Sequence, residues 1–171
     1  VLVDDLEEIV TPDIRDWPRY LPLSDNFELS DLNGFNNEPI DDVVIRGAHA
    51  PPFEFDFKAL PDDRFLPGNV MTLRYSYGPQ VNPLTSLVEV QLDGITVAGR
   101  RLDSIDGKRR ATLKVELPEQ HITPQSKLKV YLRFDPRERR SCSRVTDHQL
   151  WGTIHSDSTF NLNRQQVAKL P

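Results

Sequence analysis

A period-two alternation of apolar and polar residues runs through the chain from Val43 onward, and it constrains the fold more than any other feature. Successive side chains of a β-strand point to opposite faces of a sheet, so such a stretch predicts a strand with one buried face. The clearest examples are "FEFDF" (53–57), "VMTLRYSY" (70–77), "ATLKVELP" (111–118) and "SKLKVYLRF" (126–134).

Turn residues separate about nine such short segments, and no stretch shows the apolar spacing of a helix of about ten residues. Asp93-Gly94 lies between two apolar runs and predicts a tight hairpin, because a type I′ turn needs positive φ at both central residues. Strands with one wet face form antiparallel sheets, and two such sheets stack into a sandwich. We therefore predict an all-β fold, an antiparallel β-sandwich of the jelly-roll type with about nine strands and little helix.

The first 42 residues differ from the rest, because they are acidic and interrupted by prolines. We predict that residues 1–42 are a linker or lead-in that packs on a single jelly-roll domain of residues 43–171. A helix in the lead-in would be short, around Leu29 to Leu32. Because the chain begins with Val1 rather than Met, we expect it to be a piece of a longer protein.

The charge is distributed unevenly along the chain. Residues 1–63 carry 16 acidic and 4 basic side chains, whereas residues 64–171 carry 10 acidic and 17 basic ones, for a net charge of −5. The acidic half disfavours nonspecific binding to nucleic acid, and we expect no such partner. A basic cluster in the second half would suit an anion or an acidic partner, although a solvated loop explains it as well; it consists of Arg137, Arg139 and Arg140.

The stretch "SCSRVTDHQLWGTIHSDSTF" (141–160) holds residue types that hydrolases use. We interpret it instead as strands joined by a polar turn, because no nucleophile elbow is present and turns favour such residues. His148 and His155 are seven residues apart, so on one strand they would face opposite sides of the sheet. We expect no catalytic residue, no metal site and no cofactor, and we interpret the single cysteine, Cys142, as inert. The candidates for a Ser–His–Asp catalytic triad in this stretch are Ser156 or Ser158, His148 or His155, and Asp147 or Asp157.

Aromatic side chains are the stronger functional signal, because sugar rings stack on exposed aromatic rings. Tyr75 and Tyr77 share the strand register of Met71 and Leu73, so burial in the core competes with a sugar-binding role for both. The carbohydrate-contact candidates are Trp151, Trp17, Tyr75 and Tyr77.

Several motifs in order resemble the periplasmic B subunit of bacterial cellulose synthase, over roughly residues 17–162. They are "DIRDWPRYLPLSDNFELSDL", "VVIRG", "FEFDFKALPDDRFLPG", "TLRYSYGPQVNPLTSLVEVQLDG" and the closing Cys, "LW" and "DST". The resemblance implies a jelly-roll domain of the carbohydrate-binding kind, and the lead-in is more similar to that of the second such domain. That family has also carried the label of a cyclic-di-GMP-binding protein, but we find no paired-arginine motif, such as R-x-x-x-R leading a β-barrel, that would support nucleotide binding here.

The resemblance implies a non-catalytic role in guiding β-1,4-glucan and in subunit assembly. It implies the catalytic subunit and neighbouring flavodoxin-like domains as partners. It also implies a periplasmic location, with an inner-membrane anchor outside this chain. An alternative is a free-standing carbohydrate-binding module of another secreted polysaccharide-active enzyme. A jelly-roll hydrolase is a third hypothesis, which would require paired carboxylates or a Ser–His contact.

Overall fold

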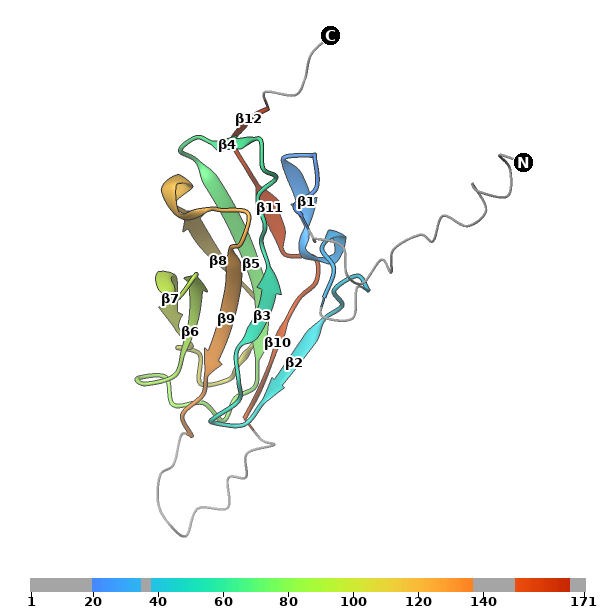
Figure 1. Ribbon diagram of the computed structural model, residues 1–171. Coiled ribbons are helices and arrows are strands. Elements are labelled where there is room, and N and C mark those ends of the chain that lie inside the picture. Colours follow the sequence, from blue (N-terminus) through green and yellow to red (C-terminus); the bar gives the residue numbers. More distant parts are fainter. Residues whose placement is uncertain (1–19, 35–37, 137–149, 167–171) are drawn as a thin grey trace, which may run out of the picture.

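Two antiparallel β-sheets stack face to face in the computed structural model, which describes residues 20–34, 38–136 and 150–166 (Figure 1). The larger sheet has six strands in the order β1-β11-β5-β10-β2, with β8 on the other side of β5. The smaller has four strands in the order β3-β9-β6-β7. A separate two-stranded ribbon pairs β4 with β12.

The nine-residue strand β5 (Asn69–Tyr77) is the centre of the six-stranded sheet. Along one side it pairs with β8 (Lys108–Leu117). Along the other side two short strands lie end to end, β11 against its first half and β10 against its second. The outer strands complete the sheet, with bounds β1 (Asn26–Glu28), β2 (Val43–Arg46), β10 (Trp151–Ile154) and β11 (Thr159–Asn161).

The four-stranded sheet is built around β6 and β9, which pair over six residues. Two 3₁₀ turns and the small ribbon complete the described elements. The bounds are β3 (Phe53–Asp56), β6 (Leu87–Leu92), β7 (Ile95–Arg101), β9 (Lys127–Arg133), β4 (Asp63–Phe65), β12 (Arg164–Gln166), η2 (Leu29–Asp31) and η3 (Glu119–His121).

The core lies between the two sheets and is aromatic at one end. The Phe160 ring of β11 stacks on Phe27 at 5.0 Å and on Phe57 at 5.3 Å, and meets Phe55 of the opposite sheet edge-on at 6.3 Å. Gly152 of β10 lies so close to β9 and its extension that a Cβ atom there would stand 2.7 Å from Leu132 Cδ1. These contacts join the sheets into one sandwich.

The predicted β-sandwich is confirmed. All nine expected strands are present, and the described residues add three strands of three residues each, β1, β4 and β12. The hairpin at Asp93-Gly94 is also confirmed, with φ values of 52° and 83°. The short helix expected near Leu29 is the 3₁₀ turn η2. The division at residue 42 stays a prediction, although β1 pairs with β11 and Leu29 is fully buried.

Candidate functional site

The outer face of the four-stranded sheet carries a regular lattice of side chains. Glu89 on β6 lies opposite Tyr131 on β9 and opposite Gly99 on β7, so these three form one row across adjacent strands. Leu87 forms the next row with Arg133 on one side and Arg101 on the other. The neighbouring positions Val88, Val90, Val130 and Leu132 are buried, which fixes both rows on the outer face.

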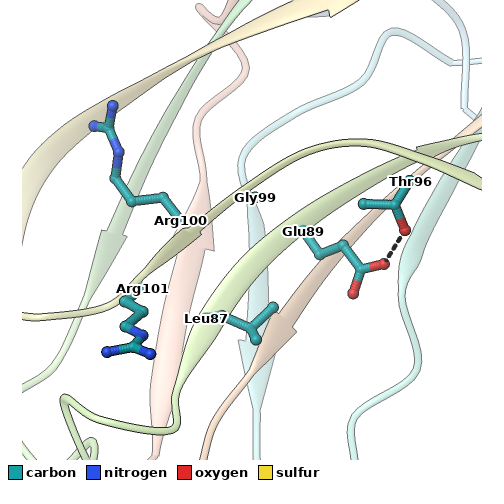
Figure 2. A pocket seen from close by; sticks show the side chains of 6 residues that line it. All are labelled: Leu87, Glu89, Thr96, Gly99, Arg100 and Arg101. Atoms are coloured by element: carbon teal, nitrogen blue, oxygen red, sulfur yellow. Dashed lines mark hydrogen bonds between the residues drawn. The ribbon is translucent and has the colours of Figure 1, made fainter.

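A hollow of about 450 Å³ opens on this face over Gly99, and we call it the Gly99 hollow (Figure 2). It exists because glycine places no side chain in a row whose other members are large. An ideal Cβ atom at Gly99 would stand 3.4 Å from the Val88 carbonyl oxygen, so this backbone lies close to the neighbouring strand. The lining residues are Leu87, Glu89, Thr96, Gly99, Arg100 and Arg101.

Glu89 is the fixed polar group of the hollow. Its Oε2 accepts hydrogen bonds from Thr96 Oγ1 at 2.6 Å and Gln91 Nε2 at 2.8 Å, and its Oε1 accepts one from Arg133 Nε at 2.9 Å. The bond from Thr96, followed by that from Gln91, holds the pKa of Glu89 below its usual value. The carboxylate is therefore ionised at neutral pH, and it is held in one orientation.

A cation–aromatic pair borders the same row. The Arg133 guanidinium lies over the Tyr131 ring, with its carbon 4.1 Å from the ring centroid. Arg133 also contacts Glu89, so Tyr131, Arg133 and Glu89 are positioned as one unit. At the opposite border, Arg101 is exposed, and none of the described residues forms an ion pair with it.

Arg100, the neighbour of Arg101, points away from Glu89 (Figure 2). Its Nη1 donates to the Thr112 carbonyl oxygen at 2.8 Å, which joins β7 to β8 across the open side of the sandwich. Arg100 therefore supports the edge of the hollow, while Arg101 is an exposed cation at its border.

The tyrosines Tyr75 and Tyr77 are core residues. Their exposed fractions are 2% and 3%, and their rings stack on each other at 6.3 Å. Burial raises the pKa of both hydroxyl groups, and the Tyr77 hydroxyl accepts a hydrogen bond from the Ser104 amide at 3.0 Å. Neither ring offers a face to a sugar, which corrects the hypothesis that these two residues contact carbohydrate.

Trp151 begins β10 on the outer face of the six-stranded sheet and is partly exposed. The pyrrole edge of its indole occupies the space that a side chain at Gly78 would need, with Nε1 2.4 Å from the ideal Cβ position. Glycine at position 78 therefore allows the indole to lie close to the strand. Trp17 lies outside the described residues, as do Arg137, Arg139, Arg140, Cys142 and His148.

A Ser–His–Asp contact does occur, but between residues that the sequence did not bring together. The Ser76 hydroxyl is hydrogen-bonded to Nε2 of His155, and Asp42 Oδ2 lies 3.5 Å from Nδ1 of the same ring. The Ser156 amide donates to Asp42 at 2.7 Å, and this bond is the main cause of the lowered pKa of Asp42.

The surroundings of Ser76 do not favour hydrolysis. A catalytic histidine accepts the serine proton at Nε2. Ser76 Oγ also lies within hydrogen-bond distance of the Arg109 carbonyl oxygen, at 2.7 Å, so this backbone oxygen competes with Nε2 of His155 for the hydroxyl hydrogen. Ser76 is also 94% buried, since only 6% of it is exposed. We interpret this contact as a structural connection between β5 and the segment before β2.

Ser158 has a similar structural role, as expected for a turn residue. Its Oγ accepts from the Arg74 amide at 2.8 Å and donates to the His155 carbonyl oxygen at 2.8 Å. Asp157 pairs with Arg110 on the neighbouring strand β8. In the part of the chain that the structure describes, no group of three or more metal-ligating side chains gathers, and no helix is long and apolar enough to cross a membrane.

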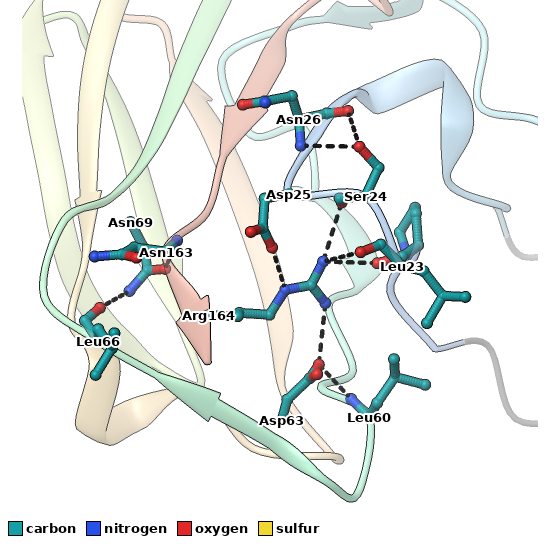
Figure 3. Close-up of polar contacts among 11 residues, drawn as sticks. Leu23, Ser24, Asp25, Asn26, Leu60, Asp63, Leu66, Asn69, Asn163 and Arg164 are labelled. Carbon is teal, nitrogen blue, oxygen red and sulfur yellow. Dashed lines mark hydrogen bonds and ion pairs between the residues drawn. The ribbon is translucent and has the colours of Figure 1, made fainter. Parts of the chain in front are cut away.

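Arg164 is a buried cation whose side chain is inaccessible to a ligand (Figure 3). Its Nε donates to Asp25 at 2.8 Å and its Nη1 to Asp63 at 3.0 Å. Its Nη2 is surrounded by three backbone carbonyl oxygens, those of Pro22, Leu23 and Ser24. This cluster attaches the chain before β1 to the β4–β12 ribbon and is structural.

A second groove of about 730 Å³ lies between β7 and the turn that follows β8. Its lining combines exposed Ile95 with charged or polar side chains that include Lys114, Glu116, Glu119 and His121. None of its lining carboxylates is held by several described donors as Glu89 is, so its polar groups are less ordered for a ligand than those of the Gly99 hollow.

The sequence interpretation missed Tyr131, Glu89 and Gly99. Alternation in "SKLKVYLRF" already places Tyr131 opposite the buried set, on the wet face of its strand. The row formed with Glu89 and Gly99 needs the register between three strands, and that register is not readable from one strand alone.

One family model matches the chain, with the description "Cellulose synthase BcsB, second CBM domain", over residues 28–159. A search of the curated proteins returned no match. The matched range covers more than three quarters of the chain and includes both sheets, from β1 to the start of β11. The chain therefore belongs to the family of second carbohydrate-binding domains of the cellulose synthase subunit BcsB.

Proposed function

We propose that this chain is a non-catalytic accessory domain of bacterial cellulose synthase, which contacts the β-1,4-glucan and packs against other parts of the synthase. The observation that carries the proposal is the family match over residues 28–159. The arrangement around Ser76 supports the non-catalytic part, because its hydroxyl group is buried and has a backbone carbonyl oxygen as a second hydrogen-bond partner.

The proposed setting is the periplasm, where the domain would act beside the catalytic subunit and the flavodoxin-like domains of its own subunit, with the inner-membrane anchor elsewhere in that subunit. Exposed surface on both sheets supports two simultaneous roles, one toward glucan and one toward protein. Trp151 is the proposed aromatic contact on the six-stranded sheet, with Trp17 as a second candidate. The basic cluster Arg137, Arg139 and Arg140 is a proposed contact for an acidic partner.

Two measurements on the 171-residue chain test the proposal. Calorimetric titration with cellohexaose tests glucan contact, and capture of the detergent-solubilised catalytic subunit on immobilised chain tests assembly. We expect weak but saturable binding in the first and specific retention in the second. Absence of both would refute the accessory role, whereas glucan binding without capture would favour the free-standing binding module.

A further inference from the structure

We propose that the Gly99 hollow is a sugar-binding subsite, which holds one residue of a neutral β-linked glucan against the outer face of the four-stranded sheet. This inference rests on the proposed function, because the family match supplies the carbohydrate class. The location, the neutral charge of the ligand and the contacting residues come from the geometry of the hollow.

The floor of the hollow suits the flat C–H face of a pyranose. It consists of the Gly99 backbone and the Leu87 side chain, which present apolar surface between two polar borders. The volume of about 450 Å³ lies within the range of about 300–1,000 Å³ that is usual for small-molecule sites. A branched side chain at position 99 would project into this floor.

Glu89 provides a fixed acceptor for a sugar hydroxyl. A carboxylate has about four lone-pair positions, and described donors fill three of them on Glu89. Its Oε1 accepts only from Arg133, so this oxygen keeps one position for an incoming O–H donor. Since Thr96, Gln91 and Arg133 already hold the carboxylate in place, a ligand does not have to order it.

Arg101 provides the matching donors from the other border. A planar guanidinium can donate two parallel hydrogen bonds, which suits two adjacent hydroxyl oxygens of a sugar. Leu87 lies between Arg101 and Arg133 in the same row, so the donors and the apolar floor belong to one continuous surface. The face of one pyranose ring would lie on the apolar floor. Hydroxyl groups on one edge of the ring would then donate to Glu89, and hydroxyl groups on the opposite edge would accept from Arg101.

Glu89 disfavours an anionic group at its own border of the hollow. Its carboxylate is ionised and only 15% of its side chain is exposed, so a ligand carboxylate or phosphate placed beside it meets a poorly screened negative charge. An anionic group can pair only with Arg101 at the opposite border, whereas hydroxyl groups can donate to Glu89 and accept from Arg101. A neutral glucan therefore uses both borders of the hollow, and a polyuronate uses one.

The test is titration of the 171-residue chain with cellohexaose and with oligogalacturonate of equal length. Gly99→Val fills the hollow without changing a charge, and valine is well tolerated in strands. Thr72→Val, at a partly exposed position of β5 on the outer face of the opposite sheet, is the matched control for folding and surface chemistry. Arg101→Met removes the donors, and Trp151→Ala tests the rival surface. Circular dichroism and the thermal midpoint establish that each variant is folded.

We expect Gly99→Val and Arg101→Met to weaken cellohexaose binding by about tenfold or more, which corresponds to about 1.4 kcal/mol. Thr72→Val should bind like the parent chain, and oligogalacturonate should bind more weakly than cellohexaose. Unchanged affinity in folded Gly99→Val, or loss only in Trp151→Ala, would overturn the subsite and leave the proposed function standing. No binding by the parent chain would refute its glucan contact and the subsite together.

Discussion

Replacement of Arg164 by methionine is expected to destabilise the fold more than any change to a surface ion pair. The guanidinium is fully buried and connects three separate segments, namely the chain before β1, the start of strand β4 and strand β12. Methionine preserves much of the side-chain length and the apolar packing, so the loss isolates the charge and its hydrogen bonds.

The expected loss of unfolding free energy follows from Asp63, the ion-pair partner that stays buried after Arg164 is replaced. The Asp63 side chain is 5% exposed, and without Arg164 its Oδ2 keeps only the hydrogen bond from the Leu60 amide at 3.0 Å. Loss of one partner from a buried ion pair costs about 3–5 kcal/mol, since the remaining charge is buried and uncompensated. The Asp25 side chain is 36% exposed and can be rehydrated, so its pair with Arg164 adds about 1 kcal/mol at most.

Urea unfolding followed by tryptophan fluorescence measures this loss. With an m value of about 2 kcal/mol per molar urea, a loss of about 4 kcal/mol lowers the midpoint by about 2 M. The control is the double variant Arg164→Met/Asp63→Asn, which removes the uncompensated charge. It should recover about 1–3 kcal/mol relative to Arg164→Met alone, because the two groups are in direct contact.

A cost below about 1 kcal/mol for Arg164→Met would contradict the argument, because it would mean that Asp63 is hydrated in the variant. Additive effects of Arg164→Met and Asp63→Asn on the free energy of unfolding would also contradict the argument. Either result would show that the cluster is held by its backbone contacts rather than by charge.

Two further outcomes are expected from other parts of the sandwich. Gly152→Ala should lower the free energy of unfolding by about 1–3 kcal/mol, because its Cβ atom would stand 2.7 Å from Leu132 Cδ1 of the opposite sheet. A thermal midpoint equal to that of the parent would show that the sheets can separate at low cost. The lowered pKa values of Asp42 and Glu89 stabilise the fold above the unfolded pKa of about 4, and this stabilisation is lost as the pH falls through the folded pKa values. Asp42→Asn should therefore flatten the acid limb of a stability-against-pH curve, and an unchanged limb would exclude its contribution.

Much of the fold was predictable because alternation is a local signal. The apolar positions of "VMTLRYSY" and "SKLKVYLRF" are the buried positions of β5 and β9, and Asp93-Gly94 forms the expected turn. The strands β1, β4 and β12 were missed because a segment such as 164–166 is too short to show a period. Their formation depends on partners elsewhere in the chain, as in the pairing of β12 with β4.

The candidate site was less predictable because its parts belong to different strands. From the sequence alone, Glu89 is an ordinary solvent-exposed acid. The strand register brings Thr96, Gln91 and Arg133 into hydrogen-bond contact with it. Tyr75 had two possible roles in the sequence, and its burial against the opposite sheet decided between them. Ser76 and Asp42 were not considered beside His155, since they lie far from it along the chain.

The pairing of early strands with late ones affects how the domain can be made and exported. β1 and β2 belong to the beginning of the described chain, yet they pair with β11 and β10 near its end. A chain that leaves a ribosome or a translocation channel amino end first cannot complete the six-stranded sheet until residues 151–161 have also emerged. Until then, the growing chain exposes unpaired strand edges, which favour aggregation and recruitment of chaperones. Such non-local pairing also predicts slow folding for a domain of this size.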